Sequence, residues 1–152
     1  MPIISPELAL STKGFIEDQI ASFLGEIGLI DLILASPECT NHSCARGNRK
    51  RNEESRDTAL FVLNFVRSLR PRWVVIENVV QMRLWPGYAT LLAELKRSYR
   101  TKVQTLDAAN FGVPQQRRRL FVICDREADP PDLSGQVIRP PQTVSKILDL
   151  SV

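Results

Sequence analysis

The hydrophobic positions of the chain follow two alternating patterns. Apolar residues at helical spacing predict helices over residues 16–27, 59–69 and 88–99. Short apolar or alternating runs predict strands near residues 32, 75, 104 and 122. Helices that alternate with strands in this way predict an α/β fold with a partial doubly wound, mainly parallel sheet that is covered on both faces. In such a sheet, ligands bind beyond the carboxyl ends of the strands.

Length and composition favour one globular unit. The chain has 152 residues and 43% hydrophobic content, which suits one packed domain better than two. No apolar stretch has the length of a membrane helix, and the first twelve residues lack the pattern of a signal peptide. Three cysteines are an odd number and do not predict a disulfide framework. We therefore expect a cytoplasmic protein with at least one free thiol and no membrane partner.

The positive charge of the chain is mild but clustered. The formal net charge is +3, and the basic residues gather in the segments 46–51 and 117–119. Both segments lie near predicted strand ends, where arginines can face phosphate groups. A solvated basic surface would give the same pattern.

Two reactive side chains follow the first two predicted strands. Cys39 lies in the polar loop 36–43 after the first strand, and Glu77 comes directly after the second. Both are therefore expected at the same edge of the sheet. Taken singly, Cys39 could be a small apolar residue at a strand end and Glu77 a solvated or helix-capping acid. His42 and Cys44 beside Cys39 also raise the alternative of a zinc site, but the segment lacks a second ligand pair, and no metal is predicted.

A third polar segment opens the last predicted strand. Residues 110–121 form a turn that leads into three consecutive arginines, Arg117, Arg118 and Arg119. Side chains alternate along a strand, so Arg117 and Arg119 are expected on one face and Arg118 in solvent. The alternative is a merely solvated strand edge.

In their order and spacing, these three segments resemble the cytosine-5 DNA methyltransferases. The resemblance covers residues 15–121. Its most specific parts are Glu77-Asn78-Val79 and the run 111–119, and Arg56-Asp57-Thr58 resembles a weaker block beside the cofactor. The resemblance implies a sheet of the S-adenosylmethionine-dependent methyltransferase type.

The resemblance also implies a reaction and a role for each reactive residue. Cys39 matches the nucleophile that adds to carbon 6 of a cytosine flipped out of double-stranded DNA. Glu77 matches the residue that holds and protonates ring nitrogen 3. Arg119 matches the residue on the cytosine carbonyl oxygen, and Arg117 supports the loop and the cofactor side.

Further contacts are implied for the cofactor and for DNA. Five residues are expected beside S-adenosylmethionine: Asp18, Pro37, Glu38, Thr58 and Asn78. Four are expected to face DNA: Ser43, Arg46, Arg49 and Gln115.

The sequence also departs from the family pattern. Glu38 precedes Cys39 where the family has proline, and no Phe-x-Gly-x-Gly turn occurs in the chain. We expect residues 1–128 to form a partial catalytic domain. The Pro-rich residues 129–152 are expected to lead toward a target-recognition domain that the chain lacks. Three hypotheses stay open: a DNA methyltransferase or its catalytic part, an inactive remnant that binds DNA or a partner, and a zinc-binding module that uses Cys39, His42 and Cys44. The chain could also be one subunit of a split enzyme that needs a complementing chain, or a fragment.

Overall fold

A computed structural model describes residues 29–37, 58–140 and 142–146. The predicted helix over 16–27 lies outside these residues. Within the described ranges, no helix is both long and apolar enough to cross a membrane.

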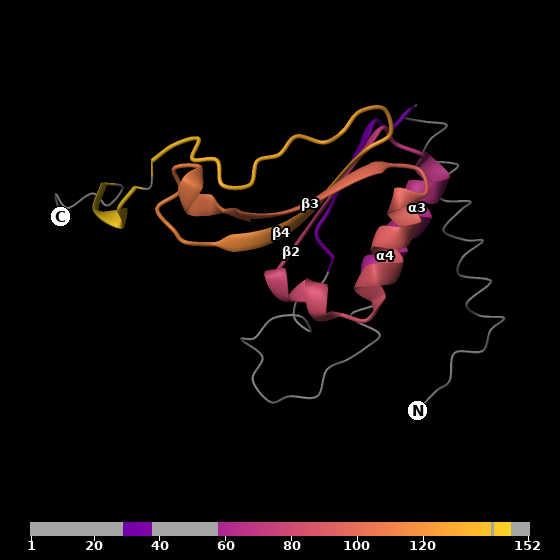
Figure 1. The fold of residues 1–152 in the computed structure, drawn as a ribbon, viewed down its shortest axis with the longest axis horizontal. Helices are drawn as coiled ribbons and strands as arrows, with labels where there is room; N and C mark the ends of the chain where they lie inside the picture. The colour runs from indigo at the N-terminus through magenta and orange to yellow at the C-terminus, as the bar shows by residue number, and fades with distance from the viewer. Residues whose placement is uncertain (1–28, 38–57, 141, 147–152) are drawn as a thin grey trace.

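All four predicted strands are present in one sheet (Figure 1). They are β1 (Leu32–Ala35), β2 (Trp73–Asn78), β3 (Arg100–Asp107) and β4 (Arg118–Asp125), in the order β1-β2-β4-β3. The predicted α/β class is confirmed. β1 and β2 pair in parallel, whereas β4 runs antiparallel to both of its neighbours, so the sheet is mixed. The reversed strand was not foreseen, because an apolar run gives no information on strand direction.

The reversed strand lies between strands that share one direction. Since β2 and β3 are both antiparallel to β4, they run parallel to each other and to β1. The carboxyl ends of β1, β2 and β3 therefore meet the beginning of β4 at one edge of the sheet. This edge is called the carboxyl edge below.

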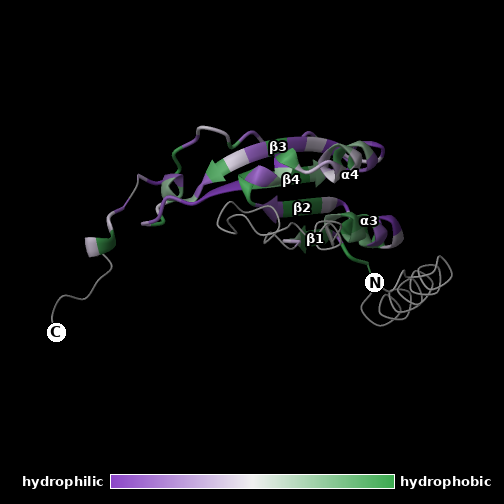
Figure 2. Ribbon diagram, turned by 90° about the horizontal axis from the view of Figure 1, so that it is seen from below, coloured by the Kyte–Doolittle hydropathy of each residue, from purple (hydrophilic) through white to green (hydrophobic). Residues whose placement is uncertain are grey.

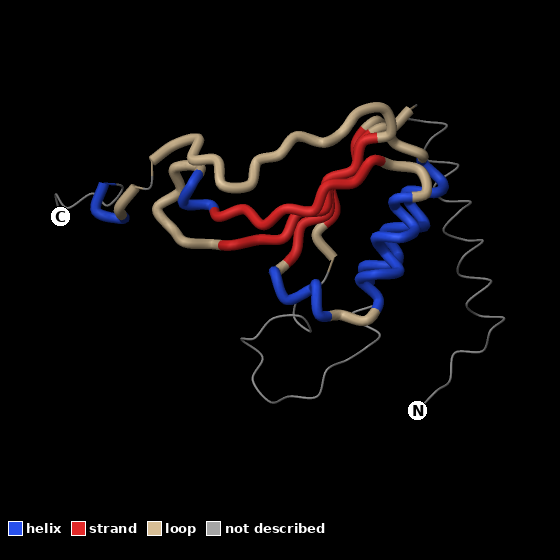
Figure 3. Tube along the Cα trace, viewed as in Figure 1, coloured by secondary structure: helices blue, strands red, loops and turns tan. Residues whose placement is uncertain are grey.

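Two helices lie on the same side of the sheet (Figure 3). They are α3 (Thr58–Leu69) and α4 (Gly87–Lys96), which confirm two of the predicted helices. α3 ends where Arg70 takes a positive φ of 47° and Pro71 follows, because proline cannot continue a helix. The expectation of helices on both faces is not met within the described ranges, where both helices pack on one face.

The core lies between these helices and the sheet. Alternate residues of β2 and β4 point toward the helices, and the apolar stripe of α3 packs on them. The core consists of Ala59, Val62, Leu63, Val66, Val74, Ile76, Met82, Trp85, Leu91, Leu95, Tyr99, Leu120, Val122 and Cys124. Each fully buried aliphatic side chain contributes roughly 1.5–3 kcal/mol to folding.

The strand β3 forms a polar edge of the sheet (Figure 2). Charged and polar side chains on an edge strand oppose pairing with another sheet. Three short 3-10 helices complete the described structure: η2 (Val80–Leu84), η3 (Ala108–Asn110) and η4 (Val144–Lys146).

The segment after β4 packs back onto β3. Gln104 is buried, donates to the Pro131 carbonyl at 2.8 Å and accepts from the Leu133 N–H at 2.6 Å. Lys102 pairs with Asp132 at 2.8 Å. The start of the predicted exit segment is thus attached to the sheet, and the predicted boundary at residues 128 and 129 stays a prediction.

Candidate active site

Strand register places Ser36 beside Glu77 at the carboxyl edge. Ala35 of β1 pairs with Ile76 of β2, so the next residues, Ser36 and Glu77, lie level on the same face of the sheet. The Ser36 hydroxyl donates a hydrogen bond of 2.6 Å to Oε2 of Glu77. One oxygen of the Glu77 carboxylate is therefore held by the end of β1.

The other oxygen of Glu77 meets Arg119. Glu77 pairs with Phe121 across β2 and β4, and Arg119 lies two residues before Phe121 on the same face. Nε of Arg119 lies 3.0 Å from Oε1 of Glu77, and Nη1 of Arg119 donates to the Arg118 carbonyl at 2.9 Å. Both side chains are partly buried, with 23% of Arg119 and 30% of Glu77 exposed. The ion pair is thus less screened by water than a pair on the open surface.

Asn78 and Pro37 join the two strand ends on the opposite face. Nδ2 of the buried Asn78 donates to the Pro37 carbonyl at 3.0 Å, and its Oδ1 accepts from the Val79 N–H at 2.8 Å. Both ends of the amide are occupied within the chain. Asn78 therefore fixes the position from which the polypeptide leaves β1 after Pro37.

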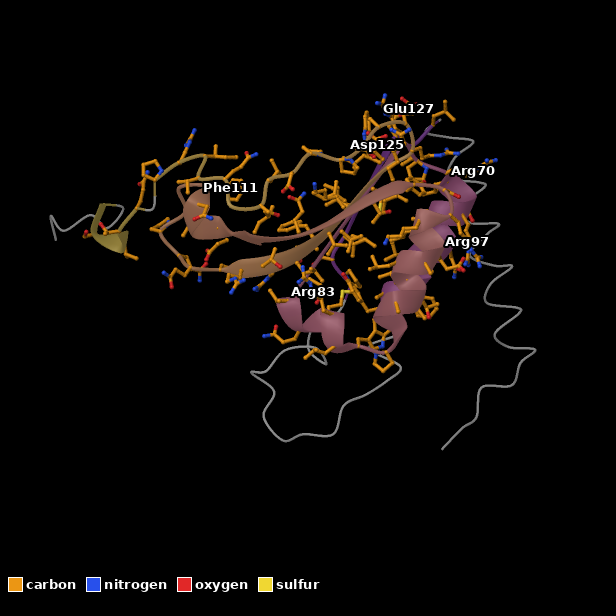
Figure 4. The ribbon with its side chains drawn as sticks, in the orientation of Figure 1. Arg70, Arg83, Arg97, Phe111, Asp125 and Glu127 are labelled. Carbon is orange, nitrogen blue, oxygen red and sulfur yellow. The ribbon has the colours of Figure 1, made fainter. Side chains whose placement is uncertain are left out.

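The turn from β3 into β4 is organised by Asp107. Its Oδ1 accepts from the backbone N–H groups of Ala109 at 3.1 Å and Arg117 at 3.0 Å. Gly112 in this turn has a φ of +84°, and a Cβ there would lie 3.0 Å from Cβ of Arg139. Glycine fits both requirements. Phe111 of this turn lies at the end of the strands that is far from α3 and α4 in Figure 4.

These elements enclose a cavity of about 380 Å³. Its walls carry one carboxylate, two guanidinium groups and several apolar side chains. The lining residues are Glu77, Leu106, Ala108, Phe111, Val113, Arg117, Arg119 and Phe121. An apolar pocket with a few convergent polar groups is typical of a site for a small ring or ligand.

Most of the chain matches one protein family. The family described as C-5 cytosine-specific DNA methylase matches residues 13–149. The chain belongs to this family. The suspected relationship to cytosine-5 DNA methyltransferases is therefore confirmed.

Curated relatives of this methylase chain are type II methyltransferases. M.AgeI from Thalassovita gelatinovora is 35% identical over 119 residues, which are 76% of this chain and 26% of the relative. M.HhaI from Haemophilus parahaemolyticus is 34% identical over 63% of this chain and 31% of its own length. M.AquIA from Picosynechococcus is 30% identical over 76% of this chain and 58% of its own length. The methylase chain thus spans between a quarter and three fifths of the length of these relatives.

Solved structures show the same fold. The methyltransferase EhMeth from Entamoeba histolytica matches 90% of this chain and 42% of its own, with a TM-score of 0.64 and 20% identity. A DNMT2 mutant from Spodoptera frugiperda matches 80% of this chain and 40% of its own, with a TM-score of 0.59 and 18% identity. The methylase chain therefore has part of a methyltransferase fold.

The structure brings three predicted site residues of the methylase together. Glu77, Arg117 and Arg119 all line the cavity, and Arg118 is exposed, as the strand alternation predicts. Gln115 is exposed in the turn before β4. Whether these residues have the predicted roles in catalysis and DNA binding stays a prediction.

Other predicted residues lie outside the described ranges. They are Asp18, Glu38, Cys39, Ser43, Arg46 and Arg49. Thr58 begins α3, but its side chain is not described. The alternative zinc site at Cys39, His42 and Cys44 lies outside the described part as well.

Four residues of this site were missed from the sequence. Ser36 and Asp107 hold Glu77 and the turn before Arg117, and Phe111 and Phe121 form apolar walls of the cavity. Ser36 directly follows an apolar run, as Glu77 does, so the same strand-end argument could have found it. Asp107 ends β3 but bonds to Arg117 ten residues later, a contact that no local pattern indicates.

Among the described residues, Cys124 is the one cysteine, and it belongs to the hydrophobic core. It is fully buried, and burial raises the pKa of its thiol to about 11. A buried neutral thiol is a poor nucleophile. Cys124 is therefore not a rival of Cys39 for a catalytic role.

Proposed function

We propose that this chain is the catalytic part of a DNA cytosine-5 methyltransferase that holds a flipped cytosine in the Glu77–Arg119 cavity. The observation that carries the proposal is the ion pair of 3.0 Å between Glu77 and Arg119 in a cavity of about 380 Å³ whose other walls, Arg117 apart, are apolar. A pyrimidine ring needs apolar contact along its faces and polar partners along its edge. Enzymes that act on a base inside duplex DNA take the base out of the stack for this purpose.

The polar groups of the cavity match the polar edge of cytosine. Arg119 has unused N–H donors that can bind the carbonyl oxygen at position 2. Glu77, once protonated, donates to ring nitrogen 3. Leu106, Phe111 and Phe121 line the cavity and would shield these interactions from water once the base is bound, which would strengthen them.

Cys39 completes the proposed reaction as the nucleophile. It follows Pro37 by two residues, and Pro37 is held beside the end of β2 by Asn78. The thiolate forms a bond to carbon 6, and the electrons of the ring double bond move toward ring nitrogen 3, where Glu77 delivers a proton. S-adenosylmethionine, when bound, would supply the methyl group for carbon 5, and its sulfur would keep the electron pair of the broken bond. A base from solvent, water or hydroxide, then takes the proton of carbon 5 as the thiolate leaves, and the ring double bond is restored. Glu77 takes its proton back in the last step.

S-adenosylmethionine is the proposed methyl donor, and it supplies an electrophilic methyl group. Pro37 and Asn78 are the predicted contacts whose side chains lie in the described ranges, but the Pro37 carbonyl and both amide atoms of Asn78 are already bonded within the chain. Each amide atom of Asn78 can still form a second hydrogen bond, so Asn78 stays a proposed contact. Further proposed contacts of the cofactor are Asp18, Glu38 and Thr58, together with further polypeptide.

A complementing methyltransferase chain is a proposed partner. The 152-residue sequence has no Phe-x-Gly-x-Gly turn, and the complement would supply it. Double-stranded DNA is the proposed substrate.

The covalent step can be tested with a trapped adduct. The chain is incubated with S-adenosylmethionine, a complementing chain and duplex DNA that contains 5-fluorocytosine, because fluorine at carbon 5 blocks the final elimination. We expect a complex that survives denaturation, and we expect Cys39→Ser to abolish it. An adduct that persists in Cys39→Ser, or no adduct with any complementing chain, would overturn the proposal.

Two matched variants test whether the loss is specific to Cys39. Cys44→Ser changes a cysteine of the same segment, and Cys124→Ala changes the buried one. Both should form the adduct. Loss of the adduct in Cys44→Ser alone would move the nucleophile to Cys44 and contradict the assignment.

A further inference from the structure

A second cavity, of about 300 Å³, lies at the opposite end of the sheet from the candidate active site. It is formed where α3 and α4 end and where the chain leaves β4. Its lining residues are Leu63, Val66, Arg67, Arg70, Glu94, Arg97, Ser98, Tyr99 and Arg126. Figure 4 shows Arg70 and Arg97 at this end of the helices, away from Phe111. We call it the arginine pocket.

Part of the positive charge of the arginine pocket is already paired. Glu94 accepts from Arg67 at 2.8 Å and from Arg97 at 2.8 Å. Basic residues near the C-terminus of a helix also interact favourably with its dipole, so these two arginines have an ordinary structural role. Their presence alone would not indicate a ligand.

The other two arginines, Arg70 and Arg126, also lie at the C-terminus of α3, but they differ from the first two because no carboxylate of the described residues neutralises them. Among the residues that the structure describes, no carboxylate forms an ion pair with Arg70 or Arg126. Nη1 of Arg126 donates to the Arg70 carbonyl at 2.7 Å, and its guanidinium lies 5.9 Å from the centre of the Tyr99 ring. An arginine has five N–H donors, so most donors of both side chains remain available to a ligand.

The charges of the arginine pocket do not balance. The four arginines that line the pocket are offset by one carboxylate, Glu94, and by two helix C-termini that each carry about −0.5 charge. The sum is about +2. A phosphate monoester carries about −1.5 to −2 at pH 7 and has oxygens that arginines bind in pairs.

From this balance, we infer that the arginine pocket binds the phosphate group of a small ligand. The apolar floor of Leu63 and Val66 and the Tyr99 ring can contact the part of the ligand next to the phosphate. DNA held at the candidate active site is a poorer source of the phosphate. β3 and β4 have 8 residues each, so they separate the two cavities by about 26 Å at about 3.3 Å per residue. The inference is independent of methyl transfer.

Calorimetric titration of the full-length chain with inorganic phosphate tests the inference. We expect saturable binding, and we expect Arg70→Gln to weaken it about tenfold, because a charge-assisted contact is lost. Glu94→Gln removes the competing carboxylate and should tighten binding several-fold. This opposite effect separates a phosphate site from general unfolding, which could only weaken binding. No saturable binding up to about 10 mM phosphate would overturn the inference.

Arg100→Gln is the matched control. Arg100 begins β3 at the same end of the sheet, is largely exposed and does not line the pocket. This variant should keep its phosphate affinity within about twofold. An equal loss in Arg100→Gln would show diffuse charge attraction, and equal losses of phosphate and duplex DNA affinity in Arg70→Gln would show a DNA contact. Either result would overturn the small-ligand site.

Discussion

The two ends of the sheet use arginine and glutamate in different proportions. At the carboxyl edge, Arg119 and Glu77 form one partly buried pair, and Ser36 occupies the second oxygen of the carboxylate. At the other end, Arg67 and Arg97 share Glu94, while Arg70 and Arg126 find no carboxylate among the described residues. The first cavity has two guanidinium groups, those of Arg117 and Arg119, for one carboxylate, whereas the second has four for one.

This difference indicates which ligand each end can accept. Because Glu77 and Arg119 pair with each other beside apolar walls, they can exchange this contact for contacts to the polar edge of a neutral ring. A surplus of guanidinium groups instead favours an anion, because each unpaired charge gains by contact with phosphate. Arginine content alone would have assigned both ends to the same partner.

The largest effect is expected from Glu77→Gln. A glutamine cannot deliver the proton to ring nitrogen 3, and general acid catalysis contributes typically 10²–10⁴-fold. We expect methyl incorporation into duplex DNA, measured with a complementing chain, to fall by at least about 10²-fold. The control is Glu127→Gln, since Glu127 pairs with Arg72 at 3.0 Å at the other end of the sheet. If Glu77→Gln incorporates methyl groups at a rate within a few-fold of Glu127→Gln, the assigned role of the carboxyl edge is wrong.

The second effect is a loss of stability at high pH, and it comes from the buried thiol of Cys124. Burial raises the pKa of Cys124 from 9.0 to about 11, so the unfolded chain loses this proton at a lower pH than the folded chain. The contribution of Cys124 to the free energy of unfolding is therefore fully present below pH 9 and is lost as the pH rises to 11. At 1.36 kcal/mol per unit, it amounts to about 2–3 kcal/mol.

Urea unfolding between pH 8 and pH 11 measures this contribution. Burial also raises the pKa of Tyr99, which adds a decline in the same direction at high pH. Cys124→Ala should therefore show a shallower decline than the unchanged chain, but not a flat one. If the free energy of unfolding falls equally steeply with pH in both proteins, the decline does not come from Cys124.

Much of the fold could be predicted because each element has a strong local signal. The apolar spacing of α3 and Pro71 after its end predicted that helix within one residue. The strands were found as short apolar runs. The order β1-β2-β4-β3 and the reversal of β4 were not found, because they depend on pairing between segments far apart in the chain.

The same limit applies to the candidate site. Glu77 and Arg119 could be predicted because each stands at a strand end and matches a family motif. Their direct contact, and that of Ser36 with Glu77, follows from register, which sequence alone does not define. The arginine pocket was missed entirely, because its arginines come from three separate segments that end at one place.

A smaller effect is expected from Ser36→Ala. The variant removes the hydrogen bond of 2.6 Å to Glu77, and one such bond contributes about 0.5–1.5 kcal/mol. We expect methyl incorporation to fall about three- to tenfold, because the carboxylate is no longer held in place. Ser36→Thr keeps the hydroxyl and should restore most of the rate. Ser68→Ala, at an exposed position of α3, should have no effect.

The smallest effect is expected from Arg67→Ala at the arginine pocket. Its pair with Glu94 is short, but 58% of the Arg67 side chain is exposed, and exposed ion pairs contribute at most about 1 kcal/mol. We expect the free energy of unfolding to fall by about 0.5 kcal/mol in low salt. At 1 M salt the Debye length is about 3 Å, so the difference from the unchanged chain should nearly vanish. A loss above about 2 kcal/mol that persists in 1 M salt would mean that Arg67 belongs to a tightly packed pair like Glu77 and Arg119, and the contrast between the two ends would fail.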